Sequence, residues 1–196
     1  MSRALLICAL GAVTISAGCG GNNDRRSVQA RSASSSPSED ASQLSRTCAI
    51  PPRVPGKLPV RWKRRSVAIG PIYLYRVGQY RNESAQELGP LPGTNGQRYR
   101  GNKQLIFVTS RTAVTLAVAE RDRHAVRLLY NEAPFNNGFA LSDGTPTVTF
   151  GGCGVPITQW SGAFVVAGAR CVALVARDQR GVVVGHRRVP FGTRHC

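Results

Sequence analysis

The residue types best suited to catalysis are few, and their spacing does not match a known catalytic group. None of the three histidines, His124, His186 and His195, stands at the His-Glu-x-x-His spacing of a zinc protease. Ser161 lacks the Gly-x-Ser-x-Gly elbow that exposes the nucleophile of many hydrolases. His195 could activate the thiol of Cys196, but a disulfide at that cysteine would remove the nucleophile.

One pair of carboxylates has a spacing that catalysis could use. Glu120 and Asp122 stand two residues apart, so their side chains would share one face of a strand. An arginine follows each of them, which favours a solvated turn. The sequence therefore predicts no catalytic residue and no cofactor. The alternative is a secreted hydrolase that uses long-loop residues such as Asp143 or His124, within reach of Ser161.

Four cysteines remain beyond the N-terminal segment: Cys48, Cys153, Cys171 and Cys196. An even number of cysteines in an exported domain indicates two disulfides, and four cysteines allow three pairings. We favour Cys153–Cys171, which flank one predicted strand, together with Cys48–Cys196, which would join the ends of the domain. A zinc site is the competing interpretation. Since neither a Cys-x-x-Cys pair nor histidine at ligand spacing is present, no metal is predicted.

The densest basic cluster has an aromatic residue among its cations: Arg61, Trp62, Lys63, Arg64 and Arg65. Such a cluster could contact an anionic lipid surface, because tryptophan favours the membrane interface and each cation there adds about 1 kcal/mol. The alternative is an edge strand in which the tryptophan is buried and the charges face water.

The first nineteen residues have the order of an export signal: a cation at Arg3, an apolar stretch over 4–17, then Cys19. The stretch is too short for a permanent membrane span. The run Ser16-Ala17-Gly18-Cys19 resembles the lipobox of bacterial lipoproteins, although Ser16 stands where an aliphatic residue is usual. The resemblance implies cleavage before Cys19 and a lipid on its sulfur. An ordinary secretory signal, which would leave a freely secreted protein, is the alternative.

We therefore expect three regions: a signal peptide over 1–18, a lipidated N-terminus and disordered stalk over 19–46, and one folded domain over 47–196. Residues 22–46 are rich in Ser, Asn, Asp, Arg and Gln and have few apolar side chains that could offset the entropy of ordering them. A flexible stalk of about 25 residues spans roughly 25–30 Å. The remainder is the size of one ordinary domain.

The net charge of +16 arises from 26 Lys and Arg against 10 Asp and Glu. A GC-rich genome would explain arginine in place of lysine, but not the shortage of acids, so the domain should be drawn to anionic surfaces. An isoelectric point near 10.9 usually indicates a protein that binds nucleic acid, but export places the domain largely out of reach of that partner. The expected partners are the membrane through the lipid on Cys19, an anionic lipid or wall polymer, and an unidentified protein. A basic surface with no dedicated ligand is the alternative.

Hydrophobic periodicity in the domain is strand-like almost throughout. Residues 113–119 alternate Val114, Leu116 and Val118 with small residues. The other predicted strands cover 67–77, 104–109, 125–130, 145–150, 163–167, 171–177 and 182–190. We expect a hairpin turn at 120–123 and another at 178–181.

Eight or so short strands with Gly, Pro, Asn or Asp between them predict an all-β fold, and we favour one immunoglobulin-like β-sandwich. The spacing of Cys48 and Trp62 is compatible with an immunoglobulin domain. The tyrosine expected two residues before the second cysteine is replaced by Ala169, so the likeness stops at the architecture.

A second resemblance covers 149–171, where the Thr-Phe…Cys…Phe-Val-Val-Ala-Gly…Cys pattern is similar to that of small, uncharacterised envelope lipoproteins of high-GC Gram-positive bacteria. It implies no activity. The sequence as a whole predicts a lipid-anchored binding or structural module on the outer face of the cell membrane, without catalysis. Besides the hydrolase, an inhibitor or accessory subunit of an envelope enzyme is an alternative.

Overall fold

The computed structural model describes residues 43–48, 56–77, 89–131, 138–193 and 195–196, all of which belong to the compact unit Ser38–Cys196. The predicted signal peptide, Cys19 and residues 19–42 of the predicted stalk lie outside the described residues.

The described residues form ten strands, one short α-helix and two 3₁₀ turns. The strands are β1 (Gln43–Arg46), β2 (Ser66–Ile69), β3 (Ile72–Tyr75), β4 (Gly101–Val108), β5 (Val114–Val118), β6 (Val126–Leu129), β7 (Thr147–Phe150), β8 (Thr158–Val166), β9 (Arg170–Asp178) and β10 (Val183–Phe191). The helix is α1 (Val60–Arg64), and the turns are η3 (Glu120–Asp122) and η4 (Leu141–Asp143).

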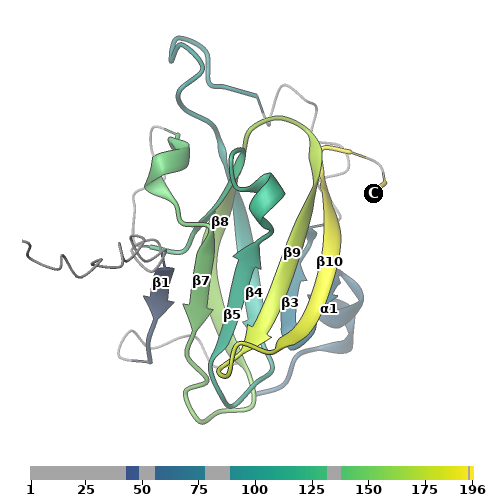
Figure 1. Cartoon of the computed structure of the whole chain (residues 1–196). Helices are drawn as coiled ribbons and strands as arrows, with labels where there is room; N and C mark the ends of the chain where they lie inside the picture. The colour runs from purple at the N-terminus through teal and green to yellow at the C-terminus, as the bar shows by residue number, and fades with distance from the viewer. Residues whose placement is uncertain (1–42, 49–55, 78–88, 132–137, 194) are drawn as a thin grey trace, which may run out of the picture. The chain divides into compact units, whose positions relative to one another are not determined.

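The strands make two five-stranded sheets, in the orders β1-β7-β5-β9-β10 and β2-β3-β4-β8-β6 (Figure 1). The prediction of an all-β sandwich is confirmed. From β4 to β9 consecutive strands alternate between the sheets, whereas immunoglobulin domains cross between sheets less often. The likeness to immunoglobulins therefore ends at the two-sheet architecture.

The alternating pattern of the strands builds the core between the sheets. On β5 the three large apolar side chains are buried, while Thr115 and Ala117 face outward. Aromatic pairs join the two sheets across this core: the ring centroids of Phe150 and Trp160 lie 5.9 Å apart, and those of Phe164 and Phe191 5.2 Å. Burial of these large rings is the main term that holds the sheets together.

The predicted hairpin turn at 120–123 is wrong. Residues 120–122 form η3, but β5 pairs with β7 and β9 while β6 pairs with β8 in the other sheet. The segment is therefore a crossing between sheets. Both strands are buried on one face, so the local alternation is the same for a hairpin and for a crossing.

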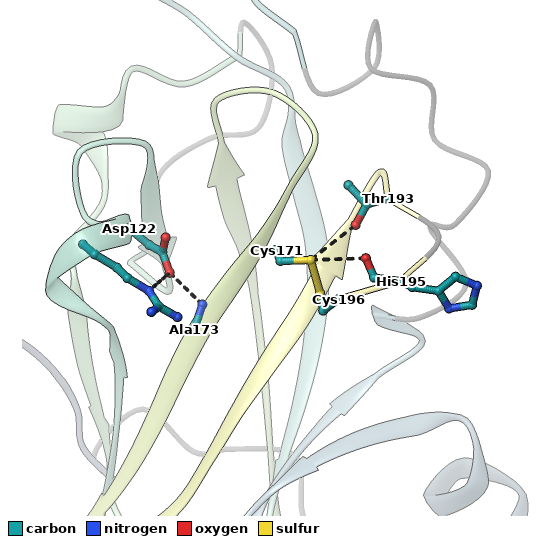
Figure 2. The surroundings of a disulfide bond; sticks show 7 residues. Asp122, Cys171, Ala173, Thr193, His195 and Cys196 are labelled. Carbon is teal, nitrogen blue, oxygen red and sulfur yellow. Dashed lines mark hydrogen bonds and ion pairs between the residues drawn. A yellow bond between two sulfur atoms is a disulfide. The ribbon is translucent and has the colours of Figure 1, made fainter.

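The predicted disulfide pairing is also wrong. The bridges are Cys48–Cys153 and Cys171–Cys196, with Cα–Cα distances of 5.4 and 5.6 Å. Figure 2 shows the second of them. The predicted partners Cys153 and Cys171 flank β8, whose nine residues extend about 30 Å. Cysteines at opposite ends of such a strand cannot reach the separation of roughly 4.4–6.8 Å that a disulfide needs.

The boundary of the predicted stalk moves by four residues. Gln43–Arg46 is strand β1, which pairs in parallel with β7, and Cys48 and Cys153 follow the two paired ends. The Gly151 N–H donates to the Arg46 carbonyl over 2.9 Å, between the ladder and the disulfide. The bridge thus fastens a short edge strand whose polar sequence carries little apolar surface of its own.

Candidate functional site

The predicted basic cluster forms helix α1 and not an edge strand. The Trp62 and Lys63 N–H groups donate to the Pro59 carbonyl over 2.9 and 3.0 Å, and the Ser66 hydroxyl donates to the Trp62 carbonyl over 2.8 Å. Arginine and lysine are good helix formers, and a single apolar residue in this run gives no strand alternation. The segment therefore closes one helical turn before β2 begins.

Trp62 fastens this helix to the outer face of the second sheet. Its ring centroid lies 5.4 Å from that of Tyr75 on β3 and 5.2 Å from that of Phe107 on β4. The ring is half-buried against the sheet. Trp62 therefore positions α1, and the neighbouring cations face solvent.

All four cations of the cluster, Arg61, Lys63, Arg64 and Arg65, are exposed. The Lys63 ammonium lies 5.8 Å from the centroid of the Tyr73 ring, a cation–π distance. Within the described part of the chain no carboxylate lies at ion-pair distance from these four side chains. The helix thus presents uncompensated positive charge.

Arg76 adjoins the end of α1 in space, and Lys103 lies near Arg76, although both are distant from the helix in sequence. Arg76 follows β3 with a left-handed backbone (φ 65°), its N–H donates to the Arg65 carbonyl over 2.8 Å, and its guanidinium lies 5.3 Å from the Tyr75 ring centroid. Arg76 and Lys103 both line a pocket of about 300 Å³ with Tyr75, Gln104, Leu105 and Ser161. We call α1 together with Arg76 and Lys103 the basic face.

The acids of the described residues lie elsewhere: Glu120 and Asp122 on η3, Asp143 on η4, and Asp178 at the β9–β10 hairpin. Three of these carboxylates accept backbone N–H groups, namely those of Ala173, Ala140 and Val182. The pKa of Arg127 is lowered, first by burial and second by the nearby positive charge of Arg123. Among the described residues, the carboxylates are therefore separated from the cations of α1.

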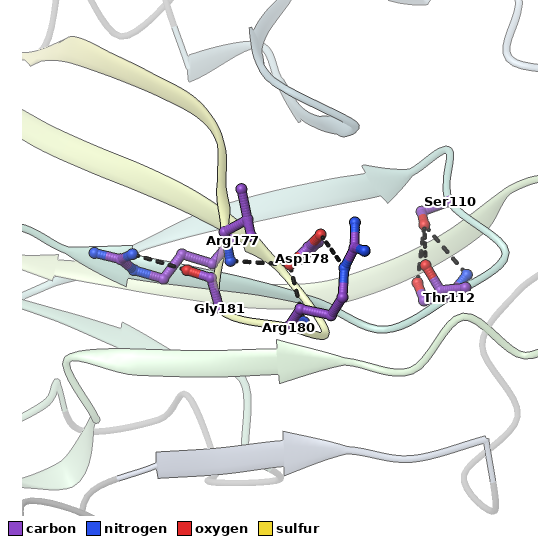
Figure 3. Close-up of polar contacts among 7 residues, drawn as sticks. Ser110, Thr112, Arg177, Asp178, Arg180 and Gly181 are labelled. Carbon is purple, nitrogen blue, oxygen red and sulfur yellow. Dashed lines mark hydrogen bonds and ion pairs between the residues drawn. The ribbon is translucent and has the colours of Figure 1, made fainter.

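A second cavity, of about 450 Å³, lies on the outer face of the first sheet. Its lining residues are small or polar: Gln43, Ala113, Thr115, Ala117, Arg123, Thr147, Thr149, Arg177, Asp178, Gln179 and Gly181. Thr149 Oγ1 accepts from Gln43 Nε2 over 2.6 Å and lies 2.8 Å from Thr115 Oγ1. Figure 3 shows one end, where Arg177 donates to the Gly181 carbonyl. We call this cavity the threonine groove.

The residues considered for catalysis come from separate elements. Asp143 is on η4, where its carboxylate accepts the Ala140 N–H over 2.9 Å, His124 follows η3, and Ser161 lies on the outer face of β8. The carboxylate pair Glu120 and Asp122 lies in the turn η3. Asp122 accepts the Ala173 N–H and so supports strand β9. Among the residues that the structure describes, no three His, Cys, Asp or Glu side chains gather as metal ligands.

The sequence prediction missed the residues that complete the basic face. Arg76 joins it because β3 ends at Tyr75, and no local pattern marks that end. Lys103 and Gln104 precede the apolar run 105–108 and belong to the same strand, β4. A buried glutamine in a strand is unusual, and the alternation of β4 could have identified Gln104 as inward-facing.

In the described ranges, no helix combines the length and apolar character needed to cross a membrane. Searches for related proteins give no further guide to the site: no family model matches the chain, and no curated protein or solved structure is significantly similar to it.

Proposed function

We propose that this protein is a lipid-anchored module on the extracytoplasmic face of the cell membrane that binds anionic surfaces and performs no catalysis. The anchor in this proposal is the predicted lipid on Cys19. Two disulfides support an oxidising compartment, since such bonds rarely persist in the cytosol.

The observation that carries the proposal is the uncompensated charge of α1. Three cations are exposed on this short helix, and the exposed Arg65 directly follows it. The exposed side chain of Val60 begins the helix, and Trp62 holds it against the sheet. At about 1 kcal/mol per cation near an anionic membrane, the four contribute about 4 kcal/mol, or about a thousandfold in partitioning. Such binding weakens as salt screens the charges.

Vesicle sedimentation across a salt series tests this proposal. The unlipidated chain is mixed with vesicles of phosphatidylcholine alone or with about one third phosphatidylglycerol. We expect binding to the anionic vesicles that decreases steeply between low and physiological salt. Replacing Arg61, Lys63, Arg64 and Arg65 with Gln should weaken it by about two to three orders of magnitude.

A matched control removes the same number of charges elsewhere. Replacing the exposed Arg111, Arg121, Arg187 and Arg188 with Gln leaves the net charge equal to that of the α1 variant. The control should retain most of the binding. Equal losses in both variants would mean that net charge alone is responsible, and binding that is absent at low salt would refute the proposal.

The threonine groove favours a second candidate, the binding of an anionic wall polymer. Its hydroxyl groups and the guanidinium groups of Arg123 and Arg177 suit a chain of sugars or polyols with negative charges. Co-sedimentation with purified wall polymer should be reduced severalfold by Arg177→Gln. Unchanged co-sedimentation would exclude the groove.

A further inference from the structure

Strand β10 is the last strand of the first sheet, and on its outer side no strand of the described residues pairs with it (Figure 1). Its nine residues extend about 30 Å. Val189 and Phe191 are buried at its end, but positions 183, 184 and 186–188 are exposed. An unpaired strand edge of this length can serve as a template for a further strand.

The backbone of Arg188 points away from the rest of the sheet. Its partner on β9 is Ala173. Ala173 directs both of its backbone groups to the opposite side: its carbonyl accepts the Ala119 N–H over 2.9 Å, and its N–H donates to Asp122 Oδ2 over 2.7 Å. Residues that face each other on antiparallel strands either bond to one another or both point away. The N–H and carbonyl of Arg188 therefore face the open edge.

Alternation along the strand extends this arrangement to the neighbouring positions. Because successive residues direct their backbone groups to opposite sides, those of His186 also face the open edge. The same holds for Pro190, and proline is tolerated on an edge strand where its missing N–H would face outward. The carbonyls of all three residues and the N–H groups of the first two are therefore placed to continue the ladder.

The side chains along this edge determine which strand would fit. His186, Arg187 and Arg188 are exposed, and no carboxylate of the residues that the structure describes lies at ion-pair distance from them. Val183 and Val184 precede them and are 47% and 41% exposed. The open edge is therefore apolar at its start and cationic farther along.

A second copy of this chain is a poor partner for the cationic part of the edge. If two β10 strands paired over residues 186–190, the cations of one copy would lie opposite those of the other, and like charges at such positions are destabilising. Carboxylates at the same positions would form cross-strand ion pairs. The charge that protects the edge from self-association thus favours an acidic strand.

We propose that β10 binds an extended acidic segment of a partner protein, which adds to the first sheet as a sixth strand. The added strand runs antiparallel to β10, with carboxylates opposite positions 186–188 and β-branched residues opposite Val183 and Val184. Main-chain hydrogen bonds to His186 and Arg188 supply affinity, and the side chains supply specificity. The interaction uses no residue of α1 and goes beyond the binding of anionic surfaces.

Amide hydrogen exchange of the ¹⁵N-labelled full chain tests the open edge. In the free protein the amides of His186 and Arg188 should exchange about tenfold or more faster than those of Arg187 and Val189, which bond to β9. Saturation with the capped nonapeptide Thr-Thr-Thr-Glu-Glu-Glu-Thr-Val-Val should slow the two outer amides by about tenfold or more. Protection of these amides in the free monomer, or no change with the peptide, would overturn the proposal.

Control peptides separate strand addition from attraction between charges. N-methylation of the first and third glutamates, which lie opposite Arg188 and His186, keeps the charge but removes the bonding N–H groups, so binding should weaken by about tenfold. N-methylation of the second glutamate, whose N–H faces away, should have a smaller effect. Replacing the three glutamates with lysine should abolish binding. Equal affinity of the first N-methylated peptide and the parent would overturn strand addition.

Two variants of the chain address the same groups. Arg188→Pro removes the outward N–H and the charge, and proline already occupies the equivalent outward position 190, so we expect about tenfold weaker peptide binding. Arg188→Gln removes only the charge and should weaken binding severalfold. A dispersed amide spectrum verifies that each variant is folded. Unchanged affinity in folded Arg188→Pro would overturn the site.

The variants used with vesicles separate this proposal from the previous one. The α1 variant should lose vesicle binding yet retain the peptide, because it leaves β10 intact. The variant that replaces Arg111, Arg121, Arg187 and Arg188 with Gln should keep most vesicle binding and lose the peptide. Outer amides that become protected without peptide as the protein concentration rises would overturn the acidic partner and assign the edge to a second copy.

Discussion

At the scale of single residues, Asp122 continues the pairing of β5 with β9 after β5 has ended. The Ala119 N–H donates to the Ala173 carbonyl over 2.9 Å, and the Ala173 N–H then donates to Asp122 Oδ2 over 2.7 Å (Figure 2). The carboxylate replaces a strand residue at the point where the chain leaves the first sheet. A role in supporting the backbone accounts for its position without any catalytic function.

Asp122→Ala should lower the free energy of unfolding by about 1.5–3 kcal/mol, because a charged acceptor is removed from a partly buried N–H. Glu120→Ala, an exposed position in the same turn, should change it by less than about 0.5 kcal/mol. Urea unfolding of both variants measures the difference. Equal effects would contradict this role for Asp122.

Asp178 makes stability depend on pH. Loss of solvation alone would raise its pKa, but the N–H groups of Val182 and Arg180 and the Arg180 guanidinium together hold the pKa below its usual value. The ionised carboxylate therefore stabilises the folded state above the unfolded pKa of about 3.9, and this contribution is lost as the pH falls through the lower folded pKa. Asp178→Ala should lower Tm near pH 6, with a smaller difference at pH 2.5. A difference in Tm that is constant over this range would contradict the assignment.

At the scale of elements, two glycines let the edge strands of the two sheets meet. Gly70 lies in the β2–β3 turn with φ 56°, and Gly185 lies at an irregularity of β10. A Cβ on Gly185 would meet the backbone nitrogen of Gly70. The sandwich is therefore closed along this edge by contact between backbones.

Gly185→Ala should destabilise the protein by about 1–3 kcal/mol, because the added methyl group meets backbone that cannot rotate away. Gly56→Ala is the control, since no atom lies within 4 Å of its added Cβ. Thermal or urea unfolding of the two variants gives the comparison. Equal destabilisation by both would contradict the explanation from the close contact at Gly185.

The strands were more predictable than their partners. The 178–181 loop was identified correctly because Asp178 and Gly181 are typical turn residues and both flanking strands stay in one sheet. The prediction at 120–123 was wrong, since alternation reports which face is buried and not which sheet a strand joins. The first half of β8 was missed because Ser161 and Gly162 interrupt its apolar pattern. Position 162 requires glycine, since a Cβ there would meet the Tyr130 ring.

At the scale of the whole molecule, the two disulfides enclose loops of different length. Replacing Cys48 and Cys153 with Ser should lower the free energy of unfolding by about 4–5 kcal/mol, since their sequence separation is 105. Replacing Cys171 and Cys196 should cost about 3–3.5 kcal/mol, for a separation of 25. Chemical unfolding of the two double variants measures both terms. A larger loss for the second pair would contradict the chain-entropy argument.

The candidate site was predictable only in part. The cations of α1 are close together in the sequence, so the sequence alone identified this cluster. The pocket combines residues from β3, β4, β8 and the position after β3, and its assembly depends on strand register. Register is a property of the complete sheet, which is why a single sequence did not indicate Arg76 as a neighbour of the helix.

Under the proposed anchoring through the N-terminal segment, the Cys48–Cys153 bridge would have a mechanical consequence. Tension that enters at β1 passes through the covalent bond to Cys153, three residues after β7 ends, so the 105-residue separation cannot be pulled out. The second bridge excludes the segment between Cys171 and Cys196 in the same way. Stretching between the two ends can extract only the chain from 153 to 171, roughly 60 Å. With both bridges closed, the covalent links therefore limit how far the sandwich can be extended.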